Sequence, residues 1–100
     1  MATYLITDIT MKDLDILNLA IEKWGRIAQI NMALEEMGEL IAAINQWKRG
    51  RIDIDAVREE VADVMITAKQ LAIIFGQAGV EKRYEEKINR LYHRVMNSKN

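Results

Sequence analysis

Apolar residues recur three and four positions apart along most of the chain, which is the spacing of an amphipathic α-helix. The sequence contains no proline and only five glycines, so little interrupts long helices. The spacing predicts four helices, over residues 11–25, 28–49, 55–76 and 80–96. We therefore expect an all-α protein with a four-helix bundle-like fold.

The ends of these helices carry sequence signals of their own. Thr10 is placed to cap the first helix, and Asp53 or Asp55 to cap the third. Glycine favours the backbone conformation that terminates a helix. Such a glycine follows each of the first three helices, at Gly25, Gly50 and Gly76.

The apolar stripes indicate which helix faces are buried. On the second helix the expected stripe is Ile30, Leu34, Met37, Ile41 and Ile44. On the first helix, Trp24 continues the stripe and is expected to pack in the core. Several helices also carry a second apolar flank, which predicts packing on two sides. In so short a chain the second side is expected to meet another copy, giving a homodimer or homotetramer.

Composition narrows the class of protein. A chain of 100 residues predicts a single domain, 1–100, and half of its residues are hydrophobic while 29% are charged, as in soluble globular proteins. A net charge of −1 argues against a nucleic-acid binder, and the lack of cysteine excludes disulfides and thiolate metal sites. The sequence shows no signal peptide and no apolar run of ~20 residues. We expect a cytoplasmic protein with no membrane partner.

Two pairs of carboxylates stand beside the apolar stripes of consecutive helices. Glu36 and Glu39 are three residues apart and share a helix face, and Glu60 and Asp63 repeat this spacing. If the two helices pack antiparallel, all four carboxylates converge in one cleft. Such negative charges repel unless cations lie among them. The competing interpretation is two solvated faces, because paired acidic residues are common on helices.

The ligand types in this cluster favour a hard cation. Oxygen-only ligation suits Mg²⁺, with Mn²⁺ as a substitute. The only histidine, His93, lies far from both pairs in the sequence, which argues against a di-iron site built on a Glu-x-x-His motif. Protein-bound Mg²⁺ usually shares its coordination shell with water and substrate phosphates. The carboxylates therefore predict a phosphate-bearing ligand.

The motif "EEMGE" at 35–39, followed after twenty residues by "EVAD" at 60–63, resembles the EExxE…ExxD pattern of the MazG-like all-α nucleoside triphosphate pyrophosphohydrolases. The likeness extends from about Leu14 to Arg94. It implies Mg²⁺-dependent cleavage of a (d)NTP between its α- and β-phosphates, giving the (d)NMP and pyrophosphate in a cleft completed across subunits. By position, the metal ligands would be Glu36, Glu39, Glu60 and Asp63.

Glu35 points about 100° away from Glu36 around the helix. Its role stays open between holding an outer-shell water, acting as the base, and being a surface residue. The chemistry needs a carboxylate that accepts a proton from the attacking water. We therefore keep Glu35, Glu36 and Glu39 as catalytic candidates.

Further candidates would hold the substrate. Lys87, Arg90 and Arg94 follow one stripe of the last helix, next to its apolar face, and are predicted to contact the phosphates. The alternative is a solvated basic face. Trp47 lies about three turns after Glu36 and is able to stack on a base, although a core or interface role competes.

Two other functions remain compatible with the sequence. One is a non-catalytic helical assembly module whose acidic cleft binds a cation or a basic partner. The other is a related hydrolase of different selectivity, for a phosphoribosyl-nucleotide or for dUTP. Base preference depends on pocket shape, so the sequence does not separate this last option from a general (d)NTP enzyme.

Overall fold

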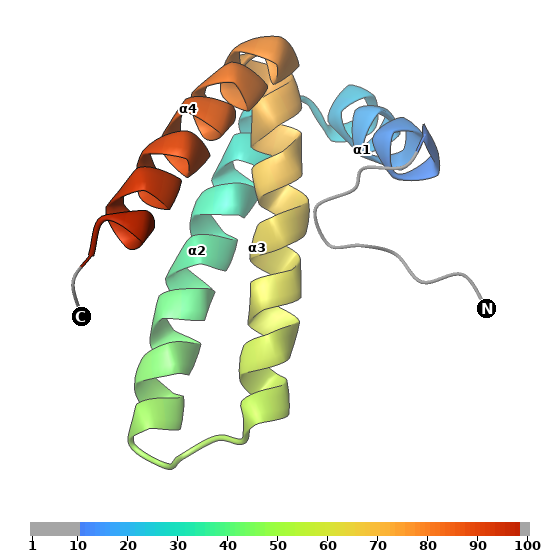
Figure 1. Cartoon of the computed structure of the whole chain (residues 1–100). Coiled ribbons are helices and arrows are strands. Elements are labelled where there is room, and N and C mark those ends of the chain that lie inside the picture. Colours follow the sequence, from blue (N-terminus) through green and yellow to red (C-terminus); the bar gives the residue numbers. More distant parts are fainter. Residues whose placement is uncertain (1–10, 99–100) are drawn as a thin grey trace.

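The computed structural model describes residues 11–98 of the chain, with side chains from Asp13 onward. It contains four helices and no strand in this range (Figure 1). The predicted all-α class is therefore confirmed, and the helix ends agree with prediction to within three residues. The helices are α1 (Met11–Trp24), α2 (Arg26–Lys48), α3 (Ile54–Phe75) and α4 (Gln77–Met96).

The helix ends follow the signals in the sequence. Gly25, Gly50 and Gly76 adopt φ values of 91°, 72° and 109°, in a region that L side chains rarely occupy. Asp53 caps α3, since its Oδ1 accepts a hydrogen bond from the backbone N–H of Ala56 at 3.0 Å. The predicted cap Thr10 lies outside the described residues.

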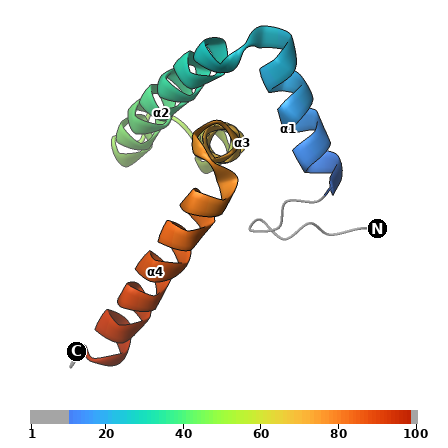
Figure 2. The same ribbon diagram turned by 90° about the horizontal axis from the view of Figure 1, so that it is seen from above.

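The centre of the molecule is an antiparallel hairpin of α2 and α3, which lie side by side along their length (Figure 1). The other two helices leave this hairpin as arms on different sides (Figure 2). The chain turns by 118° between α3 and α4, and within the described residues α4 packs only against α3. One chain by itself therefore holds only a two-helix core with two flanking helices.

The face of α2 that meets α3 differs from the predicted one. The expected stripe is turned outward, with Leu34 and Ile41 61% and 63% exposed. The buried residues of α2 are instead Gln29, Ala33 and Ala43. Alanine at a helix contact lets two backbones approach closely. The face that includes Ala33 and Ala43 also carries Glu36, so the hairpin contact itself positions this glutamate.

Apolar burial within one chain is limited. No large side chain is fully buried among the described residues, and the radius of gyration is 16.2 Å, against about 13 Å for a compact domain of 100 residues. No described residue of α4 is buried. Its apolar stripe is exposed from end to end, at Val80, Tyr84, Ile88, Leu91 and Val95.

Within residues 11–98, no single helix is long and apolar enough to cross a membrane. Only α3 and α4 taken together, as a sharply bent pair, reach the length and composition of a span.

Candidate metal centre

The hairpin brings carboxylates from its two helices together. Glu36 comes from α2, and Glu60 and Asp63 come from α3. One carboxylate oxygen of each residue lies within 4.8 Å of an oxygen of each of the others. Three of the four residues predicted from spacing thus form one group that is able to hold a metal ion.

Glu39, the fourth predicted ligand, lies at the edge of this group. Its side chain is exposed, yet its negative charge acts on both Glu36 and Glu60 and raises the pKa of each. Glu39 therefore belongs to the same electrostatic cluster, although it is not one of the three residues whose oxygens converge. We call Glu36, Glu39, Glu60 and Asp63 the carboxylate cluster.

Burial and the repulsion between carboxylates both raise the pKa of two members of the cluster, Glu36 and Glu60. Desolvation raises the pKa of Glu36 above its ordinary value, and the negative charges of Glu39 and Asp63 raise it further. The pKa of Glu60 is raised by the same causes in the same order. Each group is thus harder to ionise in the folded chain than in water, which is the electrostatic signature of a site that lacks a counter-charge.

Two carboxylate oxygens of the cluster have no hydrogen-bond donor. Glu36 Oε2 and Glu60 Oε2 are buried, and neither oxygen accepts a hydrogen bond. The two salt bridges formed among residues 11–98 join Arg58 to Asp55 and Arg83 to Glu86, so neither reaches the cluster. Buried carboxylate oxygens without donors fit a hard cation such as Mg²⁺ or Mn²⁺.

Glu35 occupies a different part of α2. It is exposed and does not join the three converging carboxylates. The helix turn of about 100° per residue directs Glu35 away from the hairpin contact that holds Glu36. Its proposed part in catalysis stays a prediction.

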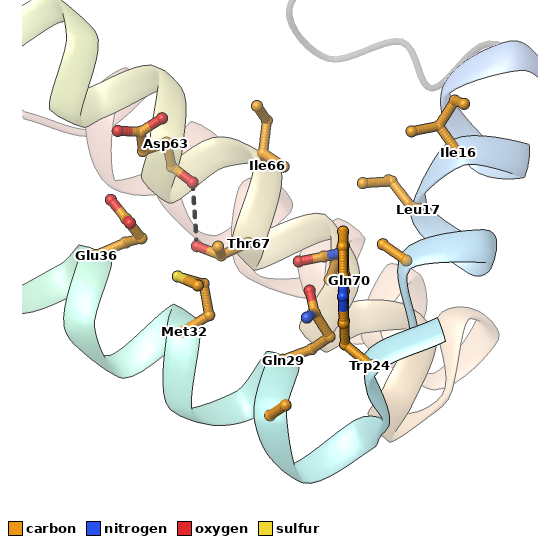
Figure 3. A pocket seen from close by; sticks show the side chains of 12 residues that line it. Ile16, Leu17, Trp24, Gln29, Met32, Glu36, Asp63, Ile66, Thr67 and Gln70 are labelled. Atoms are coloured by element: carbon orange, nitrogen blue, oxygen red, sulfur yellow. Dashed lines mark hydrogen bonds between the residues drawn. The ribbon is translucent and has the colours of Figure 1, made fainter. Parts of the chain in front are cut away.

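A cavity of about 640 Å³ opens next to the cluster, between α1 and the hairpin. Glu36 and Asp63 border one end of it, and Trp24 and Gln70 border the other (Figure 3). Ile16 on α1 adds an apolar wall. A volume of this size accommodates a small-molecule ligand, and such cavities combine apolar walls with a few polar groups.

The two tryptophans are placed differently from expectation. Trp24, predicted to be a core residue, is 60% exposed and lines the cavity from the C-terminal end of α1. Trp47 is 48% exposed near the C-terminal end of α2 and does not line the cavity. Eleven helical residues separate it from Glu36, which is about 16 Å along the axis. Its contact with a base stays a prediction.

Sequence reasoning missed three polar residues of the cavity, namely Gln29, Thr67 and Gln70, which are all buried. A positional signal was available for two of them. Gln29 precedes Glu36 by seven residues, and Gln70 follows Asp63 by seven, so each lies two turns away on nearly the same helix face.

The predicted phosphate contacts lie outside the cluster of their own chain. Lys87, Arg90 and Arg94 are exposed on α4, and in the described part of the chain this helix does not touch α2. None of the three takes part in a salt bridge that the structure forms between residues 11 and 98. Within one chain these cations and the carboxylates are thus on separate elements that do not meet.

No family model, curated protein or solved structure matches this chain. Over residues 11–98, the fold and the site establish a small all-α protein of four helices with an acidic cluster able to hold a metal ion.

Proposed function

We propose that this chain is a Mg²⁺-dependent nucleotide pyrophosphohydrolase, which cleaves a (d)NTP between its α- and β-phosphates. The observation that carries the proposal is the carboxylate cluster, in which three carboxylates converge beside a ligand-sized cavity with no protein cation among them. The resemblance of "EEMGE" and "EVAD" to the motifs of the MazG-like hydrolases supports the same reaction class.

In the proposed reaction, some of these carboxylates would hold the cation and another would accept a proton. When bound, Mg²⁺ would neutralise phosphate charge and lower the pKa of water. Glu36, Glu60 and Asp63 would hold the cation through their converging oxygens. Glu39 or Glu35 would accept the proton of the attacking water as its oxygen bonds to the α-phosphorus. The bond from this phosphorus to the bridging oxygen breaks, and pyrophosphate leaves with the electron pair.

The cavity offers room for the rest of the nucleotide. With the phosphates at Glu36 and Asp63, the sugar and base would extend towards Trp24, whose ring is able to stack on any base. The triphosphate tail needs cationic donors, and the cluster of one chain has none. Lys87, Arg90 and Arg94 would supply them from α4.

A second copy of the chain would bring those cations to the site. We propose a homodimer or homotetramer, because the outward stripe of α2 and the whole stripe of α4 leave large apolar side chains exposed. Within one chain α4 does not contact α2 in the described residues. Docking these surfaces on a second copy would bring α4 of one subunit against α2 of the other. The proposed site is thus shared between subunits.

A non-catalytic assembly module is the second candidate function. The same exposed apolar surfaces favour it, since they would serve oligomer formation whether or not the cluster is catalytic. In that case the carboxylates would bind a cation or a basic partner without turning over a substrate. Measuring catalysis separates the two candidates.

The test is pyrophosphate release from eight ribo- and deoxynucleoside triphosphates, in Mg²⁺ and in EDTA. We expect release with the matching monophosphate only in Mg²⁺, and a loss of at least about 100-fold in kcat/KM for Glu39→Gln. Glu59→Gln is the matched control, because Glu59 is an exposed glutamate of α3 outside the cluster. Absence of turnover across the panel from a folded protein that binds Mg²⁺ would favour the assembly module.

A further inference from the structure

Two buried glutamines from different helices line the cavity. Gln29 on α2 is 6% exposed and Gln70 on α3 is 4% exposed. Both lie at the Trp24 end, away from the cluster, and their carboxamides are drawn towards the same region (Figure 3). Within residues 11–98 neither carboxamide hydrogen-bonds to another residue. Neither carboxamide is among the buried side-chain groups that lack a partner, so their polar atoms are open to the cavity, where a ligand is able to hydrogen-bond with them.

The surroundings of the two carboxamides define what that ligand presents. Thr67, the third buried polar residue, already donates its hydroxyl to the carbonyl oxygens of Asp63 and Val64, at 3.1 and 3.2 Å. The remaining walls at this end are apolar or aromatic, and the cavity lining includes no Lys, Arg or His. The part of the ligand bound here is therefore uncharged, largely apolar on its faces and able to hydrogen-bond at its edge.

The spacing from the cluster fits a nucleotide. Gln29 and Gln70 each lie seven residues from a carboxylate of the cluster, which is two helical turns or about 10 Å along the axis. A phosphate held at Glu36 and Asp63 leaves this distance for a pentose and the ring attached to it. The edge of the ring would then meet the two carboxamides.

We propose that Gln29 and Gln70 determine base specificity, by hydrogen-bonding the edge of an uncharged nucleobase whose phosphates lie at the carboxylate cluster; this rests on the proposed function. A carboxamide presents a donor beside an acceptor, and nucleobase edges present the complementary pairs. Two carboxamides from opposite helices are able to contact adjacent positions of one edge.

The test compares two substrates, the best natural (d)NTP and an analogue whose benzimidazole base has no hydrogen-bonding edge. We expect the wild type to favour the natural base at least about tenfold in kcat/KM, because a site built to hydrogen-bond rejects an analogue without those groups. Gln29→Met and Gln70→Met should bring this ratio towards one, by lowering kcat/KM for the natural base. An unchanged ratio in folded variants overturns the proposal.

Gln46→Met is the matched control. Gln46 lies on α2 but does not line the cavity, so the same substitution there should keep the wild-type ratio. A ratio lowered equally by Gln46→Met would overturn the assignment to the two cavity glutamines, because the effect would then not depend on the cavity.

A second measurement uses only the wild-type protein and does not depend on catalysis. In ¹⁵N spectra of the wild type without Mg²⁺, the side-chain amide signals of Gln29 and Gln70 should shift on titration with at least one of the eight nucleosides that correspond to the substrate panel, which carry no phosphate. No shift up to the solubility limit of each nucleoside overturns the proposal. Wild-type protein that releases no pyrophosphate from any (d)NTP would contradict the proposed function instead, and the nucleoside titration would still decide the base contact.

Discussion

At the scale of single residues, the protein places carboxylates where water cannot fully solvate them. Glu36 lies on the face of α2 that packs against α3, and Glu60 approaches it from the other helix. The spacing predicted that Glu36 shares a helix face with Glu39, and Glu60 with Asp63, because a helix has a fixed angular step, and the hairpin then brings Glu36, Glu60 and Asp63 together. Gln29 and Gln70 escaped prediction, because glutamine on a helix is usually exposed.

The stability of the metal-free protein should depend on pH through Glu36 and Glu60. Their pKa values are raised in the folded chain, so folding favours the protonated forms. This contribution is fully present below the unfolded pKa, near 4.5, and is lost as the pH rises through the higher folded values. In EDTA, Tm should therefore fall from pH 5 to pH 7.5.

The variant Glu60→Gln isolates this effect from other titrating groups. Without the Glu60 charge the fall in Tm should be smaller, whereas Glu59→Gln should keep most of it. Saturating Mg²⁺ should offset the fall in the wild type, since a ligand that binds only the folded state stabilises it. A Tm that rises over this range, or an identical slope in Glu60→Gln, would contradict the assignment.

At the scale of helices, periodicity identified the elements but not every face that they bury. The ends of the helices were predictable from Gly25, Gly50 and Gly76, because glycine adopts positive φ values readily whatever its neighbours are. On α2, Leu34 and Ile41 belong to the more apolar stripe, yet the buried residues of this helix are Gln29, Ala33 and Ala43. Periodicity shows which residues share a face, whereas the neighbour on that face depends on the shape of another helix.

The apolar stripe of α4 should hold the proposed oligomer together. We expect Ile88→Asp to weaken self-association at least about tenfold, because a charge would have to be buried in an apolar contact. Asn89→Asp is the matched control, since the neighbouring side chain points about 100° away around the helix. Sedimentation velocity over a concentration series measures both. Equal association of the two variants would show that this face of α4 is not the contact.

At the scale of the whole molecule, the described residues of one chain enclose only a small core. Its described residues include only three buried hydrophobic residues, Leu17, Ala33 and Ala43, and its radius of gyration exceeds that of a compact domain. Burial of apolar surface drives folding, so a partner that covers these exposed stripes would stabilise the chain. The proposed oligomer would bury these stripes and would also complete the site.

Shared sites make a specific prediction about mixed oligomers. Glu39→Gln alone and the double variant Lys87→Gln with Arg90→Gln should each lose most activity. Co-expressed, they should form mixed oligomers in which one site takes intact carboxylates from one subunit and intact cations from the other. Pyrophosphate release by purified mixed oligomers should clearly exceed that of both parents. Activity no higher than the parents would place the cations and carboxylates of a site in one chain.

The sequence by itself determined the helical class, the helix ends and the two pairs of carboxylates that share a helix face. These depend on local conformational preference and on the angular step of a helix, both of which act within one segment. Tertiary structure decided that Trp24 lines a cavity, that Gln29 and Gln70 join it from two helices, and that Lys87 and Arg90 lie apart from the cluster of their own chain. These depend on how helices pack against one another, and the packing follows from side-chain shapes on several elements together.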